Sequence, residues 1–140
     1  MAELKQILRN VAVVSITGEA NEVMDLQLDS RKVTLGSCFI AVKGTINDGH
    51  LHIDKAIENG ATTVVCEYSP TQVMEGVCYV IVENGPEAAG IIAHNFYGRS
   101  SELLILVGVT GTNGKTTIAT LLFKLFSALG YQCGDRKSVV

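Results

Sequence analysis

A glycine-rich run near the end of the chain has the residue types and spacing that hold a phosphate chain. Residues 108–117 have the sequence GVTGTNGKTT, whose last part fits the general phosphate-loop pattern G-x-x-x-x-G-K-[ST]. The first glycine, Gly108, stands one place earlier than that pattern requires. Backbone N–H groups of such a loop, with those of the first helical turn, point toward phosphate oxygens. We expect Lys115 to neutralise β- and γ-phosphate charge, and the Thr116 hydroxyl to complete the shell of a magnesium ion.

The elements on either side of this run favour the phosphate loop over the alternative, a glycine-rich turn with an ordinary surface lysine. The apolar run Leu103–Val107 predicts a buried strand before the loop, and the residues after it predict a helix that ends at Gly130. That helix carries one apolar stripe, formed by Ile118, Leu121, Leu122, Leu125, Phe126 and Leu129.

A parallel βαβ unit needs a second strand after its helix. Residues 135–140 do not have the pattern of an apolar strand ending in an acidic residue, so we expect half of a nucleotide site. The strand and helix alone bury too little apolar surface to offset the ordering of their backbone. We therefore expect the 103–130 segment to pack against residues 1–100, to self-associate with a neighbouring chain or to be poorly ordered.

The residues before this segment predict a mixed α/β domain with one sheet of about five short strands and two or three helices. Strands are expected at 11–17, 24–28, 38–42, 62–66 and 77–82, and helices at 4–8, 50–59 and 86–97. Cys38–Val42 is continuously apolar, which predicts a strand buried on both faces. Met24, Leu26 and Leu28 alternate with polar residues, which predicts one dry face.

Composition excludes several classes of protein. The 140 residues suit one compact domain or a domain with a short addition, and 47% hydrophobic residues exclude a disordered chain. Eleven Lys and Arg against fourteen Asp and Glu give a net charge of −3, which disfavours binding to nucleic acid or to an anionic membrane. No run suits a membrane span or a signal peptide, so we expect a cytoplasmic protein. Cys38, Cys66 and Cys78 lie in apolar runs and are predicted to be reduced core thiols, and the cysteine and histidine spacing disfavours a zinc site.

Two sets of residues resemble the Mur ligases of bacterial cell-wall synthesis. The run GVTGTNGKTT resembles the ATP loop of that family, including the early Gly108. Upstream, Leu28-Asp29-Ser30-Arg31, then Phe39–Gly44 and Asp48-Gly49-His50, resemble the N-terminal domain of its E-type members, the UDP-N-acetylmuramoyl-tripeptide synthetases. The resemblance extends from about Val23 to Gly134.

This resemblance implies an ATP-dependent amide ligase that adds the third amino acid to UDP-N-acetylmuramoyl-L-alanyl-D-glutamate. In that family ATP phosphorylates the substrate carboxylate, and the amine of the incoming amino acid attacks the acyl phosphate. The implied UDP-sugar contacts are Leu28, Ser30, Thr45, Ile46 and Asn47. The implied ATP contacts are Gly111, Thr112, Asn113, Gly114, Lys115, Thr116 and Thr117, with Mg²⁺ at Thr116.

The resemblance also implies how the chain is divided. Residues 1–101 would form the N-terminal domain that binds the UDP-N-acetylmuramoyl dipeptide, and 102–134 the first strand, loop and helix of a truncated Rossmann-like ATPase domain. Residues 135–140 are interpreted as a non-native tail. The carbamylated lysine of the family, its acidic magnesium ligands and its C-terminal domain would lie outside this chain. We therefore expect no catalytic residue in the chain, and no activity from it alone.

The residues by themselves leave alternatives open. One is an accessory domain of another P-loop enzyme, such as a kinase or GTPase, and another is a non-catalytic nucleotide-sugar-binding or oligomerisation module. Asp29-Ser30-Arg31 also suits a strand-ending turn with a surface ion pair. His50 and His52 are interpreted as solvated or capping residues at a helix start. The threonine-containing loop and the segment from Leu28 to His50 favour the E-type over F-type relatives that add a dipeptide, and the contacts that choose the third amino acid would lie outside this chain.

Overall fold

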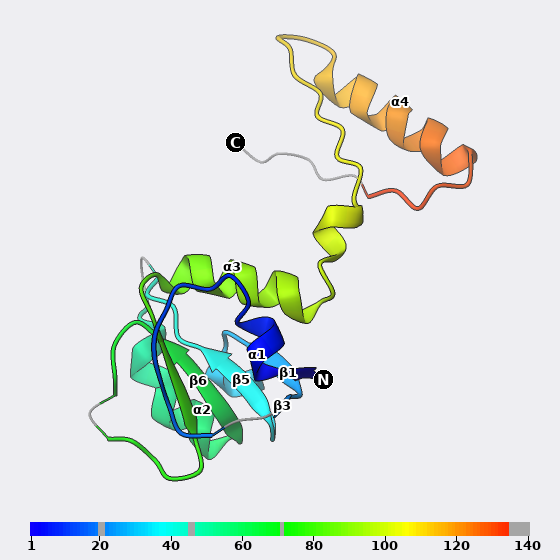
Figure 1. Ribbon diagram of the computed structural model, residues 1–140. Helices are drawn as coiled ribbons and strands as arrows, with labels where there is room; N and C mark the ends of the chain where they lie inside the picture. The colour runs from blue at the N-terminus through cyan, green and yellow to red at the C-terminus, as the bar shows by residue number, and fades with distance from the viewer. Residues whose placement is uncertain (20–21, 45–46, 71, 135–140) are drawn as a thin grey trace. The chain divides into compact units, whose positions relative to one another are not determined.

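The computed structural model describes residues 1–19, 22–44, 47–70 and 72–134. The chain divides into two compact units, a first unit Met1–Leu103 and a second unit that begins at Leu104. The first unit is a mixed sheet with helices on both faces, and the second contains helix α4 (Lys115–Ala128) (Figure 1). The predicted mixed α/β fold is confirmed.

The main sheet of the first unit has five strands in the order β2-β7-β6-β5-β4. Strands β4 to β7 run parallel, and β2 pairs antiparallel with β7. The strands are β2 (Val13–Thr17), β4 (Asp25–Gln27), β5 (Ser37–Ile40), β6 (Ala61–Cys66) and β7 (Cys78–Val82). A separate two-stranded sheet joins β1 (Ala2–Glu3) to β3 (Glu22–Val23). Every residue of β5 is buried, as the apolar run Cys38–Val42 predicts for a strand inside the sheet.

Helices cover both faces of this sheet. Helices α1 (Leu4–Ile7) and α3 (Gly85–Phe96) pack on one face around Ile92, while α2 (Ile53–Glu58) packs on the other against Phe39. The described residues of this unit also form the short 3₁₀ helices η1 (Ser30–Lys32), η2 (Gly49–His52) and η3 (Ser100–Leu103). The start of α3 follows from a local cap, because the Asn84 side chain accepts a hydrogen bond from the Glu87 N–H.

Three of the four cysteines lie in the core of the first unit. Cys38, Cys66 and Cys78 are buried free thiols, as predicted, whereas Cys133 is exposed and also free. Burial raises the pKa of the Cys38 thiol to about 12 and that of Cys66 to about 11. These two thiols therefore stay protonated at neutral pH and behave as small core hydrophobes.

The prediction that Met24, Leu26 and Leu28 form a buried strand face is wrong for two of these three side chains. Met24 and Leu28 are 54% and 60% exposed, and Leu26 alone of the three is buried. Strand β4 spans three residues at the edge of the sheet, so the flanking side chains have no neighbouring strand on one side to cover them.

The strand predicted at Leu103–Val107 is also wrong. Leu103 ends η3, and residues 104–107 belong to none of the strands in the described chain. A strand requires a partner for its backbone hydrogen bonds, and the described residues of the second unit contain no other strand.

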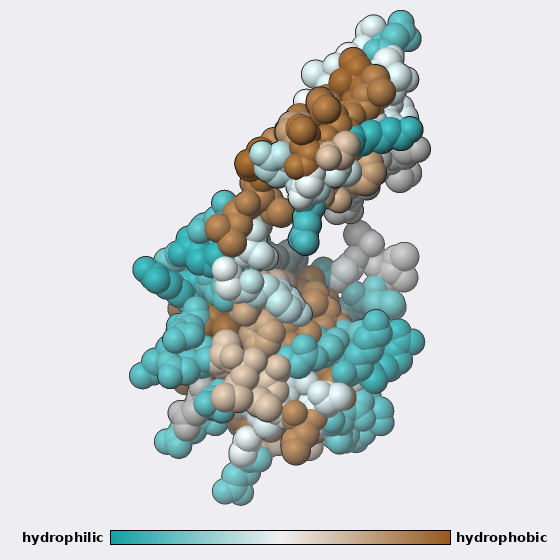
Figure 2. Space-filling view, turned by 90° about the vertical axis from the view of Figure 1, so that its right-hand side faces the viewer, coloured by the Kyte–Doolittle hydropathy of each residue, from teal (hydrophilic) through white to brown (hydrophobic). Residues whose placement is uncertain are grey.

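Helix α4 forms where the apolar stripe predicts it, and Gly130 follows it with a positive φ of 89°. No residue of α4 is buried, so Ile118, Leu121 and Leu125 remain largely exposed. Figure 2 shows apolar side chains gathered over this helix. No helix in the described part of the chain is long and apolar enough to cross a membrane.

Candidate functional site

The predicted sugar-binding residues lie at one edge of the main sheet. Leu28 and Ser30 follow β4, and Asn47 follows β5, the strand beside it. Because these strands are parallel, the residues after them leave the sheet at the same side, where ligands of open α/β sheets bind. We call Leu28, Ser30 and Asn47 the carboxyl edge. Leu28 and Asn47 are exposed and Ser30 is buried, while Thr45 and Ile46 lie outside the described residues.

A charged turn holds Ser30 in place. The Asp29 carboxylate accepts hydrogen bonds from the Arg31 backbone at 3.1 Å and from its guanidinium at 2.8 Å, and caps η1. These hydrogen bonds lower the pKa of Asp29 to about 2. The Asn59 amide donates to the Ser30 carbonyl at 2.8 Å and so ties the turn to the residue after α2. The ion pair considered from the sequence is therefore present, and it fixes the backbone next to Ser30.

The loop after β5 is closed at its base by backbone contacts. The Gly44 N–H donates to the Asn47 carbonyl, and the Gly49 N–H donates to the Val42 carbonyl, both at 2.9 Å. Lys43 and Asp48 face each other in an antiparallel bridge. A Cβ on Gly49 would lie 2.8 Å from the Val42 nitrogen, so this position has no room for a side chain. The contacts fix the chain on either side of Asn47, between the end of β5 and the start of η2.

His50 is the functional candidate that sequence interpretation missed. It is 8% exposed, so the interpretation of a solvated residue is wrong for this histidine. Its Nδ1 lies 2.6 Å from an Asp48 oxygen, and its Nε2 accepts a hydrogen bond from the Glu67 N–H at 3.0 Å. The Tyr68 ring stacks on it with centroids 4.2 Å apart. The available sequence signal was the Asp48 cap, whereas Glu67 and Tyr68 come from the far end of β6.

Charge in this cluster is balanced by hydrogen bonds. The pKa of the Asp48 carboxyl is lowered mainly by the hydrogen bond from the His50 backbone N–H and next by the hydrogen bond from the His50 ring. Partial burial and the nearby Asp48 carboxylate raise the pKa of the Tyr68 phenol, whose hydroxyl donates to Asp48 at 3.2 Å. Asp48 is therefore an anion at neutral pH that accepts bonds from two neighbours.

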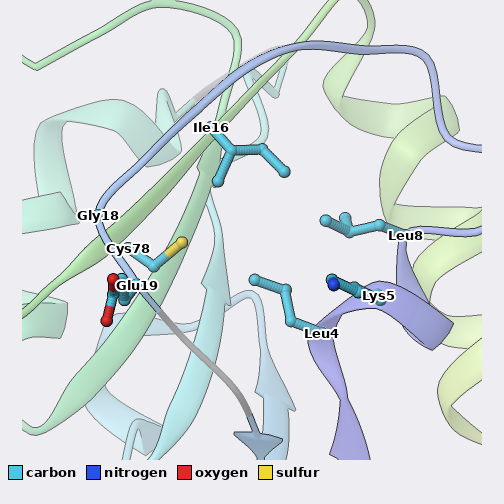
Figure 3. A pocket seen from close by; sticks show the side chains of 7 residues that line it. All are labelled: Leu4, Lys5, Leu8, Ile16, Gly18, Glu19 and Cys78. Carbon is cyan, nitrogen blue, oxygen red and sulfur yellow. The ribbon is translucent and has the colours of Figure 1, made fainter.

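A pocket of about 370 Å³ lies at the other end of the strands. Figure 3 shows Leu4, Leu8, Ile16 and Cys78 around it, with Lys5, Gly18 and Glu19 completing its lining. Cys78 is the first residue of β7, so this pocket opens at the amino side of the parallel strands. None of the predicted site residues lines it.

The second unit presents the predicted phosphate loop on its surface. Gly114 precedes α4 with φ 75°, a left-handed conformation that favours glycine, and no side chain described in the structure caps the helix there. The Lys115 ammonium donates to the Gly111 carbonyl, so the lysine folds back over the loop. All seven residues of 111–117 are exposed.

These residues fit a phosphate group. The first N–H groups of α4 lack intrahelical partners and lie beside one cation, which is the arrangement that binds anions at helix starts. Thr116 supplies one hydroxyl for a magnesium ion, and the described residues contain no cluster of three or more His, Cys, Asp or Glu able to hold a metal by themselves. The segment thus has the donor set expected for phosphate recognition, and its Thr116 hydroxyl is the group predicted to contact a metal ion.

Known proteins are similar to this chain over both the carboxyl edge and the predicted phosphate loop. The family model "Mur ligase family, catalytic domain" matches residues 22–97. Proteins named UDP-N-acetylmuramoyl-L-alanyl-D-glutamate--2,6-diaminopimelate ligase from Phocaeicola vulgatus and Cytophaga hutchinsonii are each 48% identical to the chain over 94% of its length. The chain spans 28% of the length of each of these relatives.

Solved structures share the fold. A crystal structure of MurF from Acinetobacter baumannii matches with a TM-score of 0.67 and 22% identity, over 91% of this chain and 28% of that one. A MurF ligase from Thermotoga maritima, solved in complex with ADP, matches with a TM-score of 0.52 and 30% identity, over 74% of this chain and 23% of its own.

Proposed function

Because this chain belongs to the Mur ligase family, we propose that it supplies the UDP-sugar-binding domain and the ATP loop of a ligase that joins 2,6-diaminopimelate to UDP-N-acetylmuramoyl-L-alanyl-D-glutamate. One observation carries the proposal. The alignment with diaminopimelate ligases covers 94% of the chain at 48% identity, and so includes both the sugar segment and the phosphate loop. The family membership argues against a kinase or GTPase, and the names of these relatives favour the E-type reaction over the F-type.

In the proposed reaction, ATP activates the substrate carboxylate and the amine of diaminopimelate displaces phosphate, which forms an amide. The role of this chain is to bind both nucleotides. Residues 1–101 would bind the UDP-sugar through Leu28, Ser30, Thr45, Ile46 and Asn47. Residues 102–134 would begin the ATP-binding domain.

The carboxyl edge offers neutral hydrogen-bonding groups to a sugar nucleotide. A hydroxyl, an amide and loop backbone groups bind a diphosphate or a uracil ring without a basic patch. The exposed Leu28 offers an apolar surface for a flat ring. The acidic net charge of the chain is compatible with recognition by such donors.

The phosphate loop would hold ATP through the amides of 111–117 and the Lys115 ammonium. In the unliganded loop that ammonium donates to the Gly111 carbonyl, so ATP binding would exchange this bond for phosphate oxygens. The Thr116 hydroxyl would be a ligand of the magnesium ion that accompanies ATP.

The test is Lys115→Ala in the complete natural protein, with phosphate release measured in the presence of UDP-N-acetylmuramoyl-L-alanyl-D-glutamate, diaminopimelate and ATP. We expect the rate of phosphate release to fall by about 100-fold or more, as it does when a group that stabilises charge in the transition state is removed. Lys124→Ala is the matched control, because it removes an exposed lysine from the same helix α4. Full activity of Lys115→Ala would overturn the ATP assignment, while absence of activity in the unchanged protein would overturn the proposed reaction.

A further inference from the structure

We propose that His50 is a positioning residue that, as its Nδ1–H tautomer, fixes the end of the loop after β5 for the nucleotide-sugar. The inference rests on the proposed function, since it assumes that Asn47 contacts the UDP-sugar. His50 itself would not touch the ligand. It would act through Asp48, the residue next to Asn47.

The tautomer follows from the two ring contacts. The Glu67 N–H donates to Nε2 at 3.0 Å, so Nε2 must carry a lone pair. The proton of the neutral ring therefore resides on Nδ1, which lies 2.6 Å from the Asp48 carboxylate and donates to it. The side chain of His50 is 2% exposed, which leaves little room for water to replace either bond.

The ring connects three parts of the fold. Asp48 belongs to the loop after β5, and Glu67 and Tyr68 follow β6. The Glu67 carboxylate accepts a hydrogen bond at 2.8 Å from the N–H of Gly85, the first residue of α3. The carboxyl side of β5 is thereby linked through one imidazole to the end of β6 and to the start of α3.

Asp48 is also held by bonds other than the one to the His50 ring. Its Oδ1 also accepts the His50 backbone N–H at 3.0 Å, and its Oδ2 accepts the Tyr68 hydroxyl at 3.2 Å. Asn47 is exposed, and its carbonyl accepts a bond from Gly44 within its own loop. The orientation of Asn47 toward a ligand therefore depends on the anchor at Asp48.

Fixing a binding loop before the ligand arrives raises affinity, because the ligand does not have to order the loop. Removing the ring should leave the sheet folded and lower the affinity for the sugar nucleotide by about 10-fold or more. The loss is expected because the ligand would then have to order the loop as it binds. A purely structural histidine would change stability without changing the dissociation constant of the folded protein.

The experiment compares variants of the 140-residue chain by calorimetric titration with UDP-N-acetylmuramoyl-L-alanyl-D-glutamate. His50→Ala should bind about 10-fold more weakly. His52→Ala is the matched control, an exposed histidine two positions away, and should bind normally. Ile92→Ala, which removes a fully buried side chain of α3, should lower stability without changing affinity. Equal affinity of His50→Ala and the unchanged chain would overturn the inference alone, and no binding to the unchanged chain would overturn the proposed function as well.

Two further measurements protect the test against a variant that does not fold. Tyr68→Phe removes one bond to Asp48 and retains the ring over His50, and it should weaken binding measurably, whereas unchanged affinity would count against the anchor. Proton–nitrogen NMR of the unchanged chain should show Nδ1 of His50 protonated and Nε2 bare. A protonated Nε2 would overturn the tautomer and the inference built on it.

Discussion

Replacing Gly49 with alanine tests the closed base of the loop after β5. The new Cβ would lie 2.8 Å from the Val42 nitrogen, 2.9 Å from its carbonyl oxygen and 3.2 Å from the Ala41 Cα. All three are backbone atoms of the chain just after β5, so no flexible side chain can move aside. The hydrogen bond from the Gly49 N–H to the Val42 carbonyl would be strained at the same time.

Overpacking of this kind costs about 1–3 kcal/mol. For a unit of this size each kcal/mol lowers the melting temperature by about 4–8 °C, which circular dichroism during heating detects readily. Gly90→Ala is the control, because Gly90 lies inside α3 and a Cβ there meets nothing within 4 Å. It should raise stability by about 0.5–1 kcal/mol through helix propensity. A Gly49→Ala chain that melts with or above the unchanged chain would refute the described loop geometry.

Three other results are expected. Iodoacetamide followed by mass spectrometry should label Cys133 in the folded chain and leave Cys38 unlabelled until denaturant is added, and early labelling of Cys38 would contradict its burial. The Asp29 carboxyl should titrate near pH 2 by NMR, and Arg31→Ala should raise its pKa toward the ordinary value, because the guanidinium bonds are lost while the backbone N–H of residue 31 still donates to the carboxylate. Because the folded pKa of Asp29 is depressed, its contribution to stability is present above about pH 4 and disappears as pH falls through 2. Ile92→Ala should cost about 2–5 kcal/mol in urea unfolding, since the side chain is fully buried, and a cost under 1 kcal/mol would contradict the α3 packing.

Local sequence patterns predicted most of the first unit because its elements depend on local composition. The β-branched runs that predicted strands at 62–66 and 77–82 became the buried strands β6 and β7, and the helix expected from Pro86 became α3. Turn residues marked where the chain leaves the sheet, as Asp48 and Gly49 do before α2.

What failed depended on partners that lie elsewhere in the sequence. Leu103–Val107 has the composition of a buried strand, yet composition does not supply the neighbour that a strand requires. Met24 and Leu28 alternate correctly, but the short edge strand β4 leaves them uncovered.

The candidate site shows the same division between local and distant information. The phosphate loop was predicted from the residue types and spacing of 108–117 together with the elements expected on either side, of which the helix after it is present as α4. The role of His50 could not be predicted in this way. The N–H that donates to its ring belongs to Glu67, 17 positions later, and its stacking partner Tyr68 follows that residue. Burial of a histidine by such distant contacts has no signature in the residues around it.

NMR mapping of the sugar-nucleotide site tests the central claim most directly. UDP-N-acetylmuramoyl-L-alanyl-D-glutamate is titrated into the nitrogen-15-labelled chain, and the amide shifts are followed. The account predicts that the largest changes fall on Leu28, Ser30 and Asn47 at the carboxyl edge. Changes confined to the pocket beside Cys78 at the opposite end of the strands, or no changes at millimolar ligand, would contradict it.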